Sequence, residues 1–246
     1  MSEYEAHSGY AGGLGIAKEE TPNVAVTPPT KFLEIASESF NETRNWFNAA
    51  GIHGVRSRHK FASAETTLDP RGGFEIQGLK GADLDLLIEF ALGNYASGSG
   101  YPGDVLPTFT TVVHKPPKYA VFAGCKLASL QFESSETDQG LKATAEAIAM
   151  SLAEGDAEDF GTPVYAQEIP LVHSRASFSV GGEDVRARSV QVRIANALDD
   201  GVFRNSQTRL AIPEQGEREV TGELALDWNA ANYAAVMERW RAGAYA

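Results

Sequence analysis

The chain has 246 residues, of which 43% are hydrophobic and 22% charged, values typical of an ordinary globular protein rather than a disordered one. The formal net charge of −12 argues against a protein that binds DNA or RNA through a basic face. An acidic surface can also serve solubility alone. The single cysteine, Cys125, excludes an internal disulfide and a multi-cysteine metal site, and no apolar run of about 18 residues predicts a membrane span.

The first 30 residues differ in composition from the rest of the chain. Residues 1–30 are rich in glycine, proline and small polar residues and show no periodicity, and the first ten of them lack the basic and apolar regions of a secretory signal. They predict an extended N-terminal arm ahead of a single domain over 31–246, in a chain that folds in a reducing cytoplasm. The domain begins with residues 32–40, whose alternation predicts a strand with mixed faces.

The next segment carries local charge and a turn signal. Residues 44–64 are irregular and include a basic cluster of Arg56, Arg58, His59 and Lys60. Residues 65–79 hold two short β-like runs, which suggests a hairpin or a broken strand. Its turn is predicted at residues 69–73, with the sequence Asp-Pro-Arg-Gly-Gly.

Two amphipathic helices are predicted. Residues 82–92 place apolar side chains at helical spacing, and Gly93 follows where the helix should stop. The apolar stripe consists of Leu84, Leu87, Ile88, Ala91 and Leu92. A second helix is predicted over 230–241, with its N-cap at Asn229.

Most of the remaining segments alternate as strands. Residues 108–115 and 119–132 read as two strands separated by Pro116-Pro117. Residues 174–180 and 185–194 predict a hairpin whose turn is formed by residues 181–184, and residues 220–228 alternate again.

Residues 141–153 are ambiguous. Leu141, Ala145, Ile148, Ala149 and Leu152 lie at helical spacing, and the alanine and glutamate content favours a helix. The same residues also alternate, with Ala143, Ala145, Ala147 and Ala149 on one face. Periodicity and propensity alone therefore leave helix and strand open.

No motif rises above background for catalysis. The glycines at 12–15 lack both the third glycine and the preceding strand of a dinucleotide-binding loop, and no nucleotide-binding Gly-Lys-Ser/Thr sequence occurs. Cys125, in a strand-like run, is expected to be a buried, inert thiol. We assign no catalytic, cofactor-binding or metal-binding residue, and expect a protein that is not an enzyme.

Two polar clusters keep alternatives open. His53 and His59 are near one another, but their spacing of six does not align them on one helix face, so lone histidines are favoured over a metal site. Arg56, Arg58 and Lys60 could contact phosphate or form salt bridges with an acidic neighbouring subunit, and we favour the second reading.

Several short features resemble, in chain order, the tail tube (major tail) proteins of tailed bacteriophages. They are Gly13-Leu14-Gly15-Ile16-Ala17, Glu19-Glu20-Thr21, Ala25-Val26-Thr27-Pro28, Lys31-Phe32-Leu33-Glu34, Glu38-Ser39-Phe40, Gly73-Phe74-Glu75-Ile76, the helix 82–92, Phe122-Ala123-Gly124-Cys125-Lys126, Gly181-Gly182 and Arg218-Glu219-Val220-Thr221-Gly222. Each feature alone is weak, but they are colinear over nearly the whole chain.

The resemblance implies a mainly β fold, a β-sandwich or partly closed barrel with a flanking α-helix, completed by ring assembly. It favours a strand over 141–153. It implies six copies in a ring, rings stacked into a tube, and an N-terminal arm that lies on a neighbouring copy. The site of action would be the phage tail, assembled in the host cytoplasm.

The resemblance also implies partners and a surface. Other tail proteins (tape measure, tail terminator and distal tail protein) would contact the tube, DNA would pass through without specific binding, and no cofactor would be needed. An acidic lumen would repel DNA phosphates. The candidates for its lining are acidic residues on the expected strands: Glu34, Glu38, Glu75, Glu223 and Asp227.

Two other functions fit the same residues. Another ring-forming tail component, such as a tail terminator or baseplate hub, would form one ring instead of a tube. A small β-domain hydrolase or sugar-binding module would need a cleft where His53 and His59 meet a carboxylate.

Overall fold

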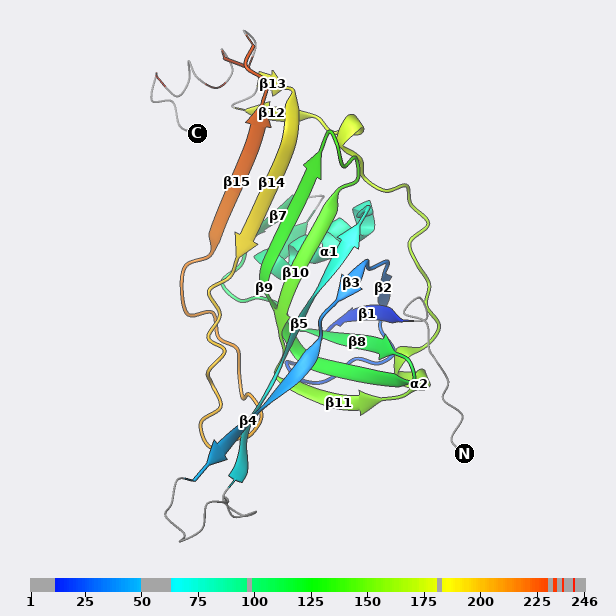
Figure 1. Cartoon of the computed structure of the whole chain (residues 1–246), viewed down its shortest axis with the longest axis vertical. Coiled ribbons are helices and arrows are strands. Elements are labelled where there is room, and N and C mark those ends of the chain that lie inside the picture. The colour runs from blue at the N-terminus through cyan, green and yellow to red at the C-terminus, as the bar shows by residue number, and fades with distance from the viewer. Residues whose placement is uncertain are drawn as a thin grey trace, which may run out of the picture.

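The fold is mainly β, as expected, and its large antiparallel sheet is not closed into a barrel. The computed structural model describes residues 12–49, 63–96, 99–180 and 183–229, together with positions 232, 233, 236 and 241. Within these residues eleven strands form one sheet with the central order β2-β1-β8-β9-β10-β5-β3 (Figure 1). Strand β11 pairs with β9, β14 pairs with β9 and β15, and β4 pairs with β5.

The elements have the following bounds. The large sheet contains β1 (Gly13–Lys18), β2 (Lys31–Leu33), β3 (Ser37–Glu38), β4 (Asn41–Asn48), β5 (Ser63–Gln77), β8 (Phe109–Lys115), β9 (Lys118–Ser135), β10 (Lys142–Ile148), β11 (Ser151–Gly155), β14 (Ala187–Ala195) and β15 (Glu219–Leu226). Two small hairpins pair β6 (Gly93–Ala96) with β7 (Ser99–Pro102), and β12 (Phe178–Val180) with β13 (Glu183–Val185). The helices are α1 (Gly81–Leu92) and the short α2 (Ala157–Phe160), with a 3-10 turn, η2, at His173–Arg175.

Strand β9 bends and belongs to two layers of the sheet. Its first half pairs with β8 and β11, and its second half pairs with β10 and β14. The bend lies at Gly124, whose φ of 64° is a conformation that favours glycine. Opposite this point, strand β10 ends and β11 begins, and Met150 N between them donates to Ala123 O at 3.0 Å. Bends of this kind let strands pass from one layer into another.

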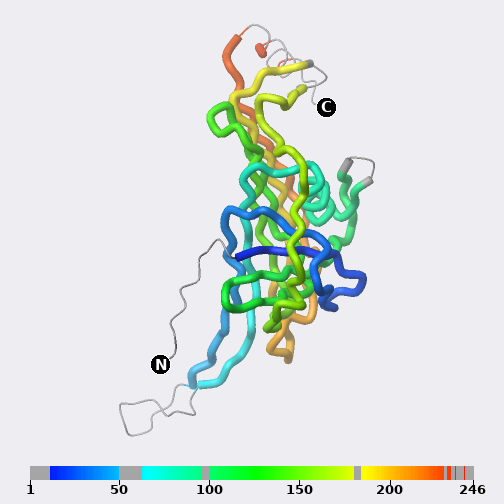
Figure 2. The backbone as a smooth tube through the Cα atoms, turned by 90° about the vertical axis from the view of Figure 1, so that its right-hand side faces the viewer, coloured from blue at the N-terminus to red at the C-terminus, as the bar shows by residue number. Residues whose placement is uncertain are grey.

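Helix α1 covers one face of the layer formed by the second half of β9 with β10 and β14. Leu87, Phe90 and Ala91 are fully buried against the sheet, and the Phe90 and Phe109 rings stack with centroids 4.6 Å apart. The helix coincides with the one expected over 82–92 and ends at Gly93, whose N–H donates to Glu89 O. Figure 2 shows α1 and the β6–β7 hairpin on the same side of the sheet.

The segment of ambiguous periodicity forms strands, as the resemblance favoured. In β10, Ala143, Ala145 and Ala147 face the core, whereas Thr144 and Glu146 are exposed. Because β10 pairs with β5 on one side and β9 on the other, backbone pairing outweighs the helix propensity of the alanines.

Part of the expected N-terminal arm, residues 13–18, belongs to the sheet. Strand β1 lies between β2 and β8, and its Leu14 and Ile16 are fully buried. Glu19 continues this anchoring, since its carboxylate accepts hydrogen bonds from Gly124 N, Thr110 Oγ1 and Asn23 N at 2.8–3.0 Å. The expectation of an extended arm is therefore wrong for residues 13–19, and residues 1–11 lie outside the described part.

The expected hairpin over 174–194 is also corrected. Strands β12 and β13 pair with each other, and positions 183–184 belong to β13 rather than to the turn. Strand β14 pairs instead with β15 and with the second half of β9. The helix expected over 230–241 lies outside the described residues except at four positions, but Asn229 Oδ1 accepts from Asn232 N at 2.9 Å, as expected of a cap.

Strands β4 and β5 form a hairpin that extends beyond the body of the sheet (Figure 1). The turn expected at 69–73 does not exist, because β5 runs without interruption from Ser63 to Gln77. The long loop 196–218 descends beside the base of this hairpin, where Gln207 O accepts from Leu68 N at 2.8 Å. The hairpin base is thus held on both sides.

Candidate functional site

The face of the sheet opposite α1 is polar over five adjacent strands, β15, β14, β9, β10 and β5. The registers place outward side chains of these strands side by side; for example, Glu223 lies opposite Gln191, which lies opposite Glu133. The side chains on this face, which we call the polar face, are Glu75, Gln77, Ser129, Gln131, Glu133, Lys142, Thr144, Glu146, Ser189, Gln191, Arg193, Glu219, Thr221 and Glu223. None of them is buried.

The polar face exists because the strands alternate. Inward residues such as Leu130 and Ile194 pack into the core, whereas the outward residues that alternate with them are mostly glutamate, serine, threonine or glutamine. Five of its side chains are acidic and two, Lys142 and Arg193, are basic, so the face carries a formal charge of −3. An antiparallel sheet commonly has one face packed against the core and the other face exposed to solvent.

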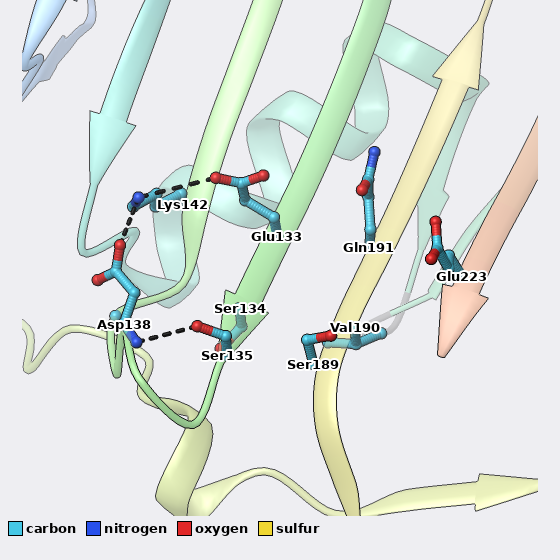
Figure 3. A pocket seen from close by; sticks show the side chains of 10 residues that line it. Glu133, Ser134, Ser135, Asp138, Lys142, Ser189, Val190, Gln191 and Glu223 are labelled. Carbon is cyan, nitrogen blue, oxygen red and sulfur yellow. Dashed lines mark hydrogen bonds and ion pairs between the residues drawn. The ribbon is translucent and has the colours of Figure 1, made fainter. Parts of the chain in front are cut away.

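A shallow hollow of about 280 Å³ lies at one end of the polar face (Figure 3). Lys142 forms ion pairs there with Glu133, at 3.7 Å, and with Asp138. The hydrogen bond to Asp138 is the main cause that raises the pKa of Lys142 above its usual value. Because the cation is neutralised within the hollow, it is a poor anchor for phosphate.

Of the five acidic candidates, two lie on the polar face and three lie elsewhere. Glu75 and Glu223 lie on the polar face. Glu34 Oε1 lies 2.6 Å from Lys80 Nζ, at the start of α1, and Glu38 lies on the core side, opposite Phe74. Asp227 follows the end of β15.

Glu38 and Asp227, like Glu34, each pair with a cation. Glu38 Oε1 lies 2.9 Å from Lys115 Nζ, and Asp227 Oδ1 lies 2.7 Å from Arg188 Nε. Sequence reasoning missed Glu133, Glu146 and Glu219, which share the polar face with Glu75 and Glu223. Alternation within their strands was the available signal, but the sequence does not reveal which strands are neighbours.

The basic candidates Arg56, Arg58 and Lys60 lie outside the described residues, as do His53 and His59. Within the described part of the chain, no group of three or more histidine, cysteine, aspartate or glutamate side chains is arranged to hold a metal ion. No described helix is long and apolar enough to cross a membrane.

Two potentially reactive side chains have structural roles. Cys125 is fully buried, and this burial raises the pKa of its thiol to about 12. His173 Nδ1 lies 3.2 Å from Ser134 Oγ, and its Nε2 lies 2.9 Å from Ala187 O. The imidazole therefore links the end of β9 to the start of β14.

The layer of strands that carries the polar face ends at two edges. Among the described strands, β15 pairs only with β14 on one edge, and β3 and β4 pair only with β5 on the other. An unpaired strand presents N–H and C=O groups that can bond to another chain. The layer is therefore open to extension at both edges.

The comparison with protein families gives the decisive match. A family model described as "Phage tail tube protein" matches residues 9–244, nearly the whole chain. The chain belongs to the phage tail tube protein family. The resemblance seen in the sequence is thereby confirmed, and membership supports a structural role in the tail of a virion. The comparison with curated proteins gives no match. In a tail tube protein, the polar face and the open strand edges are the surfaces to consider for assembly.

Proposed function

We propose that six copies of this chain form a ring, that rings stack into a tail tube, and that the polar face lines the channel through which DNA passes. The observation that carries the proposal is an uncovered, weakly acidic sheet face bounded by two unpaired strand edges, in a chain of the tail tube family.

Edge pairing provides a physical route to the ring. Strand β15 of one copy would extend the layer of the next copy at its β3 or β4 edge, so that the polar faces join into one wall. Such a contact is heterologous, and heterologous contacts close into rings when the rotation between copies is suitable. Closure would also remove the exposed edges that otherwise promote aggregation.

The chemistry of the polar face suits passage rather than binding. Its five glutamates outnumber Lys142 and Arg193, so phosphates meet a net negative surface. Its remaining side chains are serine, threonine and glutamine, which carry no charge. Ordinary nucleic-acid-binding surfaces instead cluster lysine and arginine to replace counterions. A DNA duplex in such a channel would be repelled equally from all sides.

Electron microscopy of the purified protein tests the proposal. We expect tubes built from six-fold rings, and a helical reconstruction with Glu133 and Glu223 facing the lumen. A lumen lined by the α1 side, or protein that stays monomeric at high concentration with a tail initiator present, contradicts the proposal. Isolated rings without tubes would favour a tail terminator or baseplate hub component.

Charge reversal gives a second measurement on the same tubes. In the Glu133→Lys/Glu223→Lys variant, we expect tubes to retain added duplex DNA that wild-type tubes release, with retention that weakens as salt rises. The matched control is Glu154→Lys/Glu158→Lys, which changes two exposed carboxylates that lie off the polar face. Equal retention by both variants would contradict a lumen position for Glu133 and Glu223.

A further inference from the structure

Trp228, two residues beyond the end of β15, lies exposed at the edge of the sheet. It is 79% exposed, the largest value among the large hydrophobic residues that the structure describes. The ring of Tyr233 meets the indole edge-on, with 5.3 Å between the ring centroids. Tryptophan is enriched at protein interfaces, where a few buried aromatic side chains supply most of the binding energy. An indole in this exposed position is therefore a candidate anchor for another molecule.

An apolar groove of about 370 Å³ lies on the side of the sheet that faces away from the polar face. One of its walls is Val190 of β14, whose neighbours Ser189 and Gln191 belong to the polar face. The rest of its apolar lining is formed mainly by Leu141, Ile169, Pro170, Leu171, Val172 and Phe178. Ile169 is 74% exposed, so the groove is open to a side chain from another molecule.

The groove is held in shape by backbone hydrogen bonds. Leu171 N donates to Leu79 O, and Leu171 O accepts from Leu141 N, both at 2.9 Å. His173 N donates to Gln139 O at 2.7 Å. Because these bonds attach the segment to the residues before α1 and before β10, an incoming side chain meets a preformed surface and orders little backbone on binding.

Trp228 and the groove lie toward the same end of the molecule but at opposite edges of the sheet. Strand β15 runs along the left side in Figure 1, and the segment that leads from α2 toward β12 runs along the right side. Strand β15 ends at the same end of the longest axis as β12, which begins with Phe178 (Figure 1). The bond from Leu171 to Leu79 places the groove next to the end of β5, whereas Trp228 follows the strand at the other edge of the layer.

We propose that Trp228 of one copy occupies the groove lined by Ile169 and Leu171 of the next copy in the same ring. This inference rests on the proposed ring and names a contact within it, on the side away from the channel. The contact is additional to the pairing of β15 with the β3 or β4 edge.

The positions of the two surfaces select a second copy as the occupant. Trp228 does not fill the groove of its own copy, because it is 79% exposed. In the proposed ring, the β15 edge of one copy meets the β5 side of the next, so the same movement brings Trp228 to the groove. The contact joins two different patches, and heterologous contacts of this kind close into a ring when the rotation between copies is suitable.

Charge at the two surfaces agrees with this pairing. Arg175 lines the groove, and Asp227 precedes Trp228. Asp227 Oδ1 lies 2.7 Å from Arg188 Nε within its own copy, but the Asp227 side chain is still 56% exposed and can also face Arg175 of the next copy. A guanidinium at the rim of the groove can in addition lie over the face of the indole, where a cation is attracted by the aromatic ring.

Single-site variants test each half of the contact. We expect Trp228→Ala and Ile169→Asp each to raise the protein concentration needed for ring formation by at least about tenfold. Circular dichroism should show an unchanged fold, because both residues are exposed in the single copy.

Two variants serve as matched controls. Val164→Asp introduces the same charge at a residue that is 74% exposed, as Ile169 is, but does not line the groove. Tyr101→Ala removes another exposed aromatic side chain, on the β6–β7 hairpin. Both controls should form rings at the wild-type concentration.

Mixing the two test variants probes the heterologous geometry. The Trp228→Ala protein keeps an intact groove, and the Ile169→Asp protein keeps an intact indole. At a concentration where neither variant forms rings, their equimolar mixture should therefore give dimers that do not grow further. Wild-type rings from the mixture, or no dimers at all, would contradict the proposed contact.

Cross-linking tests the contact while Trp228 and Ile169 stay in place. In the Asp227→Cys/Arg175→Cys variant, a short bismaleimide should give a ladder of covalent oligomers that ends at the number of copies in one ring, six in the proposed tube. Bands beyond six would place the contact between rings and contradict the inference. The control is Asp227→Cys/Val164→Cys, which should give little product, and the native Cys125 is fully buried and does not compete.

The outcomes separate this inference from the proposed function. If wild-type protein forms rings while the test variants match their controls and no ladder forms, the contact is wrong and the ring proposal stands. If the ladder forms in oligomers that micrographs show to be neither rings nor tubes, the contact stands and the proposed function fails. If wild-type protein forms no oligomer, both fail.

Discussion

The fully buried guanidinium of Arg209 lies 2.5 Å, through its Nη2, from Asp69 Oδ1 on strand β5. Arg209 belongs to the loop 196–218, and Asp69 lies where β5 leaves the sheet to enter the hairpin. The same guanidinium donates to Asp200 O and to Ala149 O, and it lies over the ring of Phe203 with 5.0 Å to the centroid. The pair thus joins the loop to the base of the hairpin.

Asp69→Ala should destabilise the protein strongly. The substitution leaves the Arg209 charge buried without its partner, which typically costs about 3 kcal/mol or more. The measurement is the free energy of unfolding from denaturant titration. The matched control is Asp200→Ala, whose carboxylate forms an ion pair with the half-exposed Arg71 and should contribute less than about 1 kcal/mol. Equal losses in the two variants would contradict the assigned importance of the buried pair.

The carboxylate of Asp69 should also make the free energy of unfolding depend on pH. Burial acts to raise the pKa of Asp69, but its hydrogen bonds and charge interactions with Arg71 and Arg209 outweigh this effect and lower the pKa below its usual value. The stabilisation is therefore complete above about pH 4 and is lost as pH falls through the folded-state pKa. We expect the stability difference between wild type and Asp69→Asn to shrink as the pH falls from about 4 to about 2, the range in which an aspartate with a lowered pKa titrates. A constant difference would exclude Asp69 as the titrating group.

Gly124→Ala should also be destabilising. An added Cβ would lie 2.7 Å from Met150 Sδ and 2.9 Å from Met150 Cβ, at a φ of 64°. Steric overlap and left-handed backbone together predict a loss of about 2 kcal/mol, measured by thermal or chemical unfolding. The control is Gly222→Ala, where the nearest atom, Gln191 O, is 3.9 Å from the added Cβ. A neutral Gly124→Ala would mean that β9 does not need this bend.

Cys125 should resist alkylation in the folded protein. Burial raises the pKa of its thiol to about 12, so the reactive thiolate is scarce at pH 8, and the side chain has no exposed surface. Labelling with iodoacetamide, followed by mass spectrometry, should be slow in buffer and fast in denaturant. Rapid labelling of the folded protein would show that the core around Cys125 opens readily.

Two N-terminal deletions should behave differently. Removal of residues 2–30 deletes β1 and Glu19, so β8 loses one of its two partner strands and the variant should be unstable or insoluble. Removal of residues 2–11 leaves β1 intact and should give a folded protein, measured by circular dichroism and thermal unfolding. If this shorter deletion also abolishes tube formation, residues 2–11 act between copies; if tubes form normally, the arm function is excluded for them.

Sequence patterns predicted the elements whose residues repeat locally. The apolar stripe from Leu84 to Leu92 and the glycine at 93 were sufficient for α1, because a helix contacts its own neighbours three and four residues away. The break at Pro116-Pro117 likewise separated β8 from β9. Strand β10 needed the family resemblance, since its alanines satisfy both periods.

The pairing between strands that are distant in the sequence could not be predicted in the same way. Strand β1 is short and glycine-rich, and only its partners β2 and β8 make it a strand. Strand β5 runs through a proline and two glycines because β4 and β10 pair with it, so local turn signals were misleading there. The polar face depends on strand order, which is why Glu133, Glu146 and Glu219 were missed although their own strands alternate.

The loop 196–218 also has a mechanical consequence. Strand β5 continues from the sheet into the hairpin without interruption, and Arg209 forms an ion pair with it from the side. The hairpin is therefore supported at its base and is not free to swing. A load on the tip is therefore carried into β14 and β15, which the loop connects. We therefore expect each copy to resist bending along its length, and in the proposed tube any curvature would arise at the junctions between copies.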